Sequence, residues 1–250
     1  MKKLISILLV LSLTLCFGAC GKDSDNGATE TAATTQATSQ QIPEVPAELK
    51  GMDLFFDAAS YTAVVGEIQK VSDDVYSVST AYSLRNKENI DKPLDIVIDS
   101  KELVLGTTTV SGLINSGWKM YSDLTDDSDV LAYNYAFLNV TNSKCTLTIK
   151  VYNGSNNIVS AYDCVVESVS FDGQRVDYDY YGLNSSTTLA QLVDTMGEPT
   201  GITIVDYFDG EYEYTHSNVY VKYMYDGFSA DFLYNVNGTA EVIKDISFSA

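Results

Sequence analysis

"STTLAQLVDTMGEPTG", from Ser186 to Gly201, predicts one short helix with both of its ends marked. Thr188 and Gln191 have the spacing of a capping box, in which the two side chains satisfy free backbone N–H groups at the helix start. Gly197 can adopt the left-handed conformation that ends a helix, and Pro199 prevents its continuation. Between these ends, apolar residues recur with the spacing of one helical face: Leu189, Leu192, Val193 and Met196. A helix of about three turns is unstable alone, so we expect it to pack on a sheet.

Strand patterns follow this helix to the end of the sequence. These alternating runs, rich in Tyr, Val, Ile and Phe, are separated by Asp209-Gly210, His216-Ser217-Asn218, Asp226-Gly227 and Asn237-Gly238. Asp-Gly and Asn-Gly between such runs are the strongest short indication of hairpins. A similar order occurs earlier, where TTTVSGLINSGW precedes the strand patterns VLAYNYAFLNV, CTLTIKVY and CVVESVSF. The last strand patterns also correspond, Val165–Phe171 with Val242–Phe248. The sequence therefore predicts the α+β class, with two tandem units that each pack a short helix on an antiparallel β-sheet of roughly three to five strands.

The N-terminus has the three-part layout of a secretory signal peptide. Two lysines precede the apolar run Leu4–Phe17, and the small pair Gly18-Ala19 precedes Cys20. The run LCFGACG resembles a bacterial lipobox, which implies that Cys20 is lipidated, for example with palmitate, and becomes the new N-terminus. The alternative is an ordinary signal peptide in which Cys20 has no such role.

The residues after Cys20 are rich in Thr, Ser, Ala, Gln and Asn and contain almost no large apolar side chain. Such a segment cannot bury enough surface to offset the entropy lost on ordering, so we expect a disordered tether. Lipid on Cys20 would be the only anchor, since no later apolar run is long enough to span a bilayer. The expected location is the cell membrane, with the folded part facing the extracytoplasmic side. The expected segments are 1–19 (lipoprotein signal peptide), 20–50 (disordered tether), 51–95 (N-terminal segment), 96–175 (first unit) and 176–250 (second unit).

Residues 51–95 fit neither unit and leave two alternatives, so we describe this segment as mixed. One is an amphipathic helix, whose apolar face would contain Tyr61, Val65, Ile68 and Val75. The other is a pair of strands, YTAVVGEIQKV and DVYSVSTAYSL.

The second helix and the strands after it carry a motif with a known counterpart. The motif residues are Thr188, Leu192, Met196, Gly197 and Pro199, followed by Tyr212-Glu213-Tyr214. They resemble the TxxxLxxxLGxP helix turn and the Tyr-x-Tyr strand of the beta-lactamase-inhibitor-protein-like fold, which outer-membrane assembly lipoproteins of SmpA/OmlA type share. Met196 stands where Leu is usual, and the first copy lacks the Pro. The whole order of segments also resembles surface lipoproteins of gut Firmicutes. Nothing matches an inhibitory contact loop, so the resemblance implies no inhibitor residues.

The formal net charge of −19 at pH 7 limits the classes of partner. An acidic surface repels phosphates, which excludes a nucleic-acid partner and favours exposure in the aqueous envelope or a cationic partner. The single histidine, His216, lacks the companions that a catalytic triad or a zinc site needs. The run Asp123–Asp129 has clustered carboxylates but lacks the glycine and the closing Glu of a calcium loop, which favours a solvated loop. Glu211 and Glu213 alternate on one strand face with no pocket implied. We therefore expect no enzyme, no metal and no cofactor.

Cys145 and Cys164 leave two alternatives. A hairpin around Asn153-Gly154 would place them nearly opposite each other, and a disulfide is plausible in an exported protein. However, the apolar alternation puts the two side chains on different faces unless a bulge intervenes. Two buried free thiols are the other alternative.

A binding surface can be expected from strand alternation among the 18 tyrosines and their neighbours. If Val219, Val221 and Tyr223 face the helix, the side chains between them face outward. The expected binding face consists of Tyr220, Lys222, Met224, Asp231 and Leu233. Exposed Tyr and Met side chains are useful for recognition. We expect a surface-anchored lipoprotein that acts as a non-enzymatic module binding a protein or another envelope component. The alternative is a lipoprotein that binds carbohydrate or a small solute, which would need a concave pocket lined by several tyrosines.

Overall fold

The structure is a computed structural model that describes residues 54–85, 95–121, 129–211 and 213–250. All of these residues belong to one compact unit within Ile42–Ala250. The expected signal peptide, the lipidation residue Cys20 and the tether lie outside the described residues, as does most of the acidic run Asp123–Asp129. These features therefore stay predictions.

Sixteen strands, two α-helices and two short 3₁₀-helices form the described chain. In chain order the strands are β1 (Tyr61–Val65), β2 (Gln69–Ser72), β3 (Val75–Leu84), β4 (Asp95–Ile98), β5 (Lys101–Val104), β6 (Lys119–Met120), β7 (Asp129–Val130), β8 (Tyr135–Thr141), β9 (Thr146–Tyr152), β10 (Val159–Ser160), β11 (Val165–Asp172), β12 (Tyr178–Asp179), β13 (Gly201–Asp209), β14 (Tyr214–Tyr225), β15 (Phe228–Asn237) and β16 (Ala240–Ser249). The helices are α1 (Val110–Asn115), α2 (Leu189–Met196), η1 (Ala58–Ser60) and η2 (Ala161–Asp163). None of the helices in this part of the chain has the length and apolar character needed to cross a membrane.

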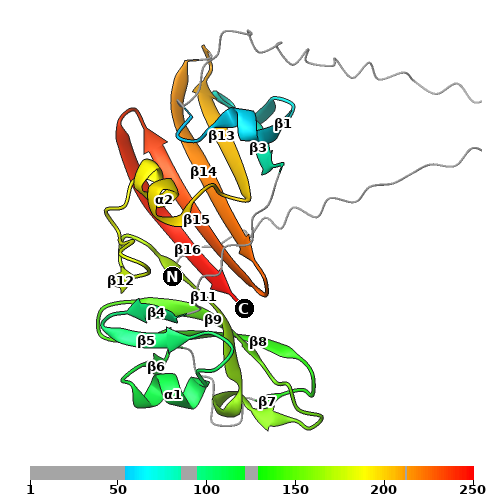
Figure 1. Ribbon diagram of the computed structural model, residues 1–250, viewed down its shortest axis with the longest axis vertical. Helices are drawn as coiled ribbons and strands as arrows, with labels where there is room; N and C mark the ends of the chain where they lie inside the picture. The colour runs from blue at the N-terminus through cyan, green and yellow to red at the C-terminus, as the bar shows by residue number, and fades with distance from the viewer. Residues whose placement is uncertain (1–53, 86–94, 122–128, 212) are drawn as a thin grey trace, which may run out of the picture. The chain divides into compact units, whose positions relative to one another are not determined.

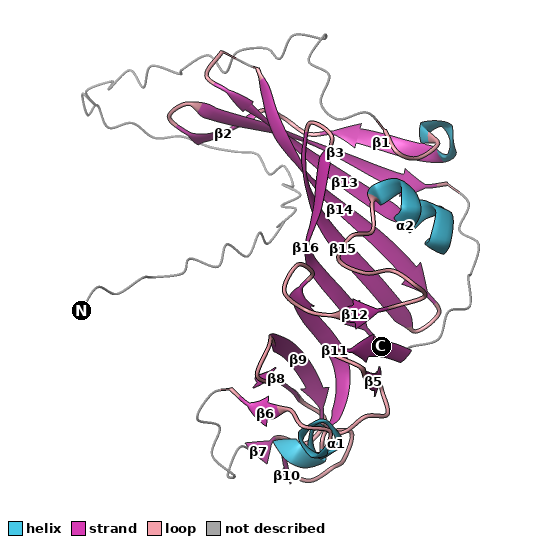
Figure 2. Cartoon of the chain, turned by 90° about the vertical axis from the view of Figure 1, so that its left-hand side faces the viewer, coloured by secondary structure: helices cyan, strands magenta, loops and turns pink. Residues whose placement is uncertain are grey.

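The largest sheet contains eleven strands (Figures 1 and 2). Its neighbours follow the order β1-β3-β13-β14-β15-β16-β11-β9-β8-β6, and β2 also pairs with β3. Every strand pairing in this sheet is antiparallel, as expected for strands joined by hairpins. Two smaller sheets have the orders β12-β4-β5 and β10-β7.

The predicted α+β class, with two units that each pack a helix on a sheet of three to five strands, is wrong, because the described chain is mostly β and eleven of its strands form one sheet. β11 and β16, the last strands of the two expected units, pair with each other, for example Val169 with Phe248 and Phe171 with Ile246. An edge strand leaves a row of backbone N–H and C=O groups without partners, and pairing two such edges satisfies both rows. The two α-helices have only six and eight residues. They cover parts of the sheets and do not form a helical layer on each unit.

The ends of α2 lie where the sequence predicts them. The Thr188 hydroxyl accepts the N–H of Gln191 at 3.2 Å, and the Gln191 side chain accepts the N–H of Thr188 at 2.9 Å. Gly197 ends the helix with a φ of +80°, a conformation that favours glycine. The N–H of Leu189 also donates to the Glu241 carboxylate on β16 at 2.6 Å, which joins the helix start to the sheet. The buried residues of the helix are Leu189, Leu192 and Met196.

One hydrophobic core contains side chains from both expected units, among them Leu113 and Trp118 of the first and Leu192 of the second. Phe248 lies at the junction of β16 with β11 and is fully buried. Its ring contacts four aromatic rings, with centroid distances of 4.7 to 6.4 Å: Phe171, Tyr180, Phe228 and Phe232. The core therefore extends across the pairing of β11 with β16.

The described part of residues 51–95 adopts the strand alternative, as β1, β2 and β3, and not a long amphipathic helix. Tyr61 attaches β1 to the turn after α2, because its hydroxyl lies 2.8 Å from both the Glu198 carboxylate and the Pro199 carbonyl. Burial, and then the Glu198 carboxylate, raise the pKa of Tyr61. The Phe56 ring packs edge-on against Tyr61 and Tyr82, at 4.9 and 5.0 Å between centroids. This segment thus extends the large sheet through the pairing of β3 with β13.

Candidate functional site

The candidate site is the face of the large sheet that points away from α2, which we call the outer face. On β14, Val219, Val221 and Tyr223 are buried in the core that α2 covers. Tyr220 and Met224 alternate with them and are 45% and 49% exposed. The sequence-based alternation is therefore confirmed: Lys222 is also exposed, and Asp231 and Leu233 on β15 are half-buried. Whether this face binds a partner stays a proposal.

Two straight rows of side chains cross the outer face, and in each row every residue is the register partner of the next. The first row spans eight strands: Ser83, Gly201, Lys222, Asp231, Ser247, Ser170, Thr148 and Asn139. The second row lies beside it: Ala81, Thr203, Tyr220, Leu233, Asp245 and Asp172. Both rows cross the pairing of β16 with β11, so the outer face is continuous over that junction.

These rows, apart from Asn139, line a groove of about 670 Å³. Its size lies within the range of about 300–1,000 Å³ that is usual for small-molecule sites. Six Ser or Thr residues and three Asp residues are among its twenty lining residues, and Tyr220 and Leu233 add large apolar surface. The groove can therefore offer hydrogen bonds along its length and apolar contact near its middle.

The charges of the groove are mostly negative. Lys222 Nζ lies 3.7 Å from the Asp231 carboxylate, and burial raises the pKa of Asp231 although Lys222 opposes that shift. Burial, and then the facing Asp172, raise the pKa of Asp245. Asp172 also has an ion pair with Arg175 at 3.2 Å. Since Lys222 is the only cation among the described residues that line the groove, its potential favours a neutral or cationic ligand.

The sequence-based prediction missed two exposed aromatic residues on β8. Tyr135 and Phe137 are 46% and 72% exposed, and they share the outer face with Asn139 through the alternation of the strand. The pattern VLAYNYAFLNV contained this information, because Leu138 and Val140 are the inward positions. Both faces of that run contain apolar residues, so alternation alone does not show which face is buried.

Cys145 and Cys164 are buried free thiols, and the structure does not bring them together. They directly precede β9 and β11, and these strands are antiparallel, so the two cysteines lie at opposite ends of the pair. The segment that connects β9 to β11 contains β10 and η2, so it is longer than the expected turn at Asn153-Gly154. The longer connection changes which residues of β9 and β11 pair with each other. Burial raises the pKa of both thiols, which lowers their reactivity.

The remaining candidate residues lie in one hairpin, with Glu211 and Glu213 between β13 and β14 and His216 on β14. The predicted break between strands at 216–218 is wrong, because β14 is continuous there. The His216 ring stacks on Tyr207 at 4.4 Å between centroids and 3° between planes. Glu211 and Glu213 are exposed, and the N–H of each donates to the Asp209 carboxylate at 2.9 Å. Within the described ranges, no group of three or more His, Cys, Asp or Glu side chains is arranged to hold a metal ion.

Comparisons with protein-family models, curated proteins and solved structures found no significant match to this chain. The resemblance to the beta-lactamase-inhibitor-protein-like fold and to SmpA/OmlA lipoproteins therefore stays a prediction.

Proposed function

We propose that this chain is a surface lipoprotein, anchored through lipid on Cys20, that binds another envelope protein through its outer face without catalysing a reaction. The observation that carries the proposal is that two pairs of large exposed side chains, Tyr220 with Met224 on β14 and Tyr135 with Phe137 on β8, lie on the same face of one sheet. Tyrosine gives a large and rigid contact area with a polar tip, which suits recognition of another protein.

The length of the outer face favours a macromolecular partner. Neighbouring strands lie about 4.8 Å apart, so a row that crosses eight strands is about 34 Å long. A standard protein–protein interface buries about 800 Å² on each partner, which corresponds to a patch about 30 Å across. Because the row and such a patch have similar lengths, the outer face is large enough for one standard interface.

The charge of the chain adds a condition on this partner. With a net charge of −19, the protein attracts cationic surfaces at long range and repels acidic ones. Such steering acts mainly on the association rate and weakens as salt is added. A basic envelope protein is therefore the partner that we expect.

Site-specific photo-crosslinking in the cells that produce the chain tests this proposal. A benzoylphenylalanine at position 220 or 137 of the full chain should give a discrete crosslinked species on illumination. The same group at Asp194, an exposed position on α2, is the matched control. The triple variant Tyr220→Ser, Met224→Ser and Leu233→Ser should lose the crosslink formed from position 137. Equal crosslinking from Asp194, or no crosslink from either outer-face position, would contradict the proposal.

Carbohydrate or small-solute binding is the second candidate, and the groove is the observation that favours it. Its volume of about 670 Å³ and its Ser, Thr and Asp side chains suit a small polar ligand, and Tyr220 offers a ring face for stacking. A glycan array probed with the full chain tests this alternative. A bound glycan whose signal disappears in Tyr220→Ala and persists in Phe137→Ala would support binding in the groove, whereas an unchanged signal in Tyr220→Ala would contradict it.

A further inference from the structure

A second pocket, with a volume of about 460 Å³, shares no lining residue with the groove of the outer face. Three separate segments line it: the β4–β5 turn, the segment from the end of α1 to β6, and the β8–β9 turn. Two of its lining residues are lysines, Lys101 and Lys119, and a third is Trp118. We call this site the lysine pocket. Its volume lies in the range that small organic ligands occupy.

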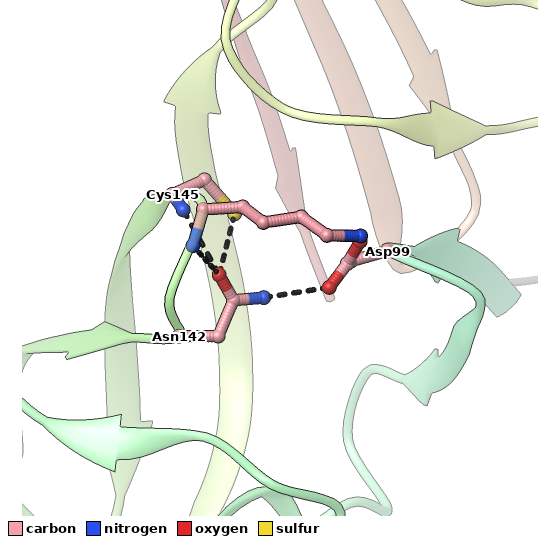
Figure 3. Close-up of polar contacts among 4 residues, drawn as sticks. Asp99, Asn142 and Cys145 are labelled. Atoms are coloured by element: carbon pink, nitrogen blue, oxygen red, sulfur yellow. Dashed lines mark hydrogen bonds and ion pairs between the residues drawn. The ribbon is translucent and has the colours of Figure 1, made fainter.

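The single carboxylate in the described lining of the lysine pocket is already neutralised (Figure 3). Asp99 accepts a hydrogen bond from the Asn142 amide at 2.9 Å and forms an ion pair with Lys144. The ion pair raises the pKa of Lys144, so that the ammonium stays charged. Asn142 is oriented in turn, because its side-chain oxygen accepts the N–H of Lys144 at 2.8 Å and the N–H of Cys145 at 2.9 Å. The negative charge of Asp99 is therefore balanced by Lys144, which does not line the pocket.

Lys101 and Lys119 have no carboxylate partner among the described residues. Both side chains are exposed, and neither forms an ion pair with any residue in the described part of the chain. Lys101, Lys119 and Asp99 give the lining a net charge of +1, and Lys144 beside it offsets the Asp99 charge, in a protein whose net charge is −19. Two ammonium groups on one pocket repel each other, and an anion between them removes that repulsion.

The end of α1 does not cancel this positive potential. Its last carbonyls accept backbone N–H groups from residues 116–118, so they are occupied by the chain itself. A helix of six residues also has a small dipole, whose effect decays within one turn. The two lysines therefore dominate the electrostatics of the lysine pocket.

We propose that the lysine pocket binds a small oxyanion with two negative charges, held between the ammonium groups of Lys101 and Lys119. Ammonium groups make strong, charge-assisted hydrogen bonds to phosphate and carboxylate oxygens alike. Trp118 forms part of the wall of the site, whereas the Thr141 hydroxyl already donates to the carbonyls of Asn142 and Cys145.

Lys119 and its register partner Thr141 share a sheet face with Phe137, whereas Lys101 belongs to the β12-β4-β5 sheet. The lysine pocket shares no lining residue with the groove, and neither lysine is substituted in the test of the proposed function, so the two proposals hold or fail separately.

The position of Trp118 gives a direct assay, because it is the only tryptophan in the chain. The full chain is titrated with inorganic phosphate and, separately, with succinate, at constant ionic strength against a sodium chloride blank. We expect a saturable change in tryptophan fluorescence with at least one of the two anions. Lys101→Gln and Lys119→Gln should each raise the dissociation constant by about tenfold or more, since each removes one charged contact. Lys244→Gln, at an exposed lysine on β16, is the matched control and should leave the dissociation constant unchanged.

The outcomes separate the ligand classes and the explanations. Saturation by phosphate alone supports a phosphate-bearing ligand, and saturation by succinate alone supports a dicarboxylate. Amide NMR shifts at positions 101 and 119 provide a second readout that does not depend on fluorescence. The inference is overturned if neither anion changes either signal in a saturable way. It is also overturned if Lys244→Gln weakens binding as much as Lys119→Gln, because general charge attraction would then explain the effect.

Discussion

Replacing Phe248 with Ala should destabilise the whole described unit, including the part that contains Trp118. Phe248 is fully buried at the pairing of β16 with β11 and packs against four aromatic rings. Loss of a buried Phe side chain costs about 3–5 kcal/mol of the free energy of unfolding, depending on how far the cavity collapses. The surrounding rings belong mostly to hydrogen-bonded strands, which cannot move inward easily. We therefore expect a cost in the upper half of that range.

The size of this change is easily measured. A cost of about 4 kcal/mol is a large fraction of the total stability of a typical protein, which is about 5–15 kcal/mol. For a unit of about 200 residues, each kcal/mol lowers Tm by about 2–4 °C, so Tm should fall by about 8–16 °C. Phe248→Leu keeps most of the volume and should cost less than about 1.5 kcal/mol. Phe137→Ala, at a residue that is 72% exposed, should change the free energy by less than about 0.5 kcal/mol.

Urea unfolding followed by two probes tests the reasoning. Trp118 fluorescence reports the segment between α1 and β6, and far-UV circular dichroism reports the strands as a whole. Because one core contains Trp118 and Phe248, both probes should show a single transition, shifted to lower urea in Phe248→Ala. If the circular dichroism transition shifted while the Trp118 midpoint stayed in place, the two halves would unfold independently. That result would refute a continuous core across β11 and β16.

Three further predictions follow from single side chains. Thr188→Ala removes half of the capping box of α2 and should cost about 1 kcal/mol in urea unfolding, whereas Thr188→Ser should cost little. Asp245→Asn should raise the free energy of unfolding at pH 7 by up to about 1 kcal/mol, discounted for solvent screening, because the charged Asp245 faces Asp172. Because the folded-state pKa of Asp245 is raised, the protonated side chain stabilises the fold at low pH, and this contribution is lost as pH rises through that pKa. The gain in free energy of unfolding from Asp245→Asn should therefore vanish in acid. A gain that persists in acid would contradict charge repulsion as its cause. Iodoacetamide should label Cys145 and Cys164 only after unfolding, by peptide mapping, and a disulfide-linked peptide would contradict the two free thiols.

The sequence predicted correctly those features that are encoded within a few residues. The limits of α2 depend on Thr188, Gln191 and Gly197, which act on backbone groups within one turn. The outward position of Tyr220 and Met224 depends on the two-residue period of a single strand. Each of these features was fixed by local chemistry, so reading the local pattern was sufficient.

Features that depend on which strands meet could not be predicted in the same way. The pairing of β11 with β16 joins segments that are far apart in the sequence, and each pattern suits an edge strand as well as a central one. The separation of Cys145 from Cys164 depends on the length of the segment between β9 and β11, for which the Asn153-Gly154 motif predicted a shorter turn. The lysine pocket requires three turns from different parts of the chain to converge. None of these arrangements has a periodic pattern of its own.

The groove on the outer face follows from the same strand pairing that overturned the predicted fold. Within the first row, Ser83, Gly201, Ser247 and Ser170 belong to four strands, and none of these positions carries a long side chain. Only the register of the joined sheet places them in one row, where they leave space on both sides of Lys222 and Asp231, the longer residues of that row. If β11 and β16 were edges of separate sheets, Ser170 and Ser247 would not face each other and the groove would end at β16. The merging of the sheets is therefore what makes the outer face long enough, and hollow enough, to serve as a binding surface.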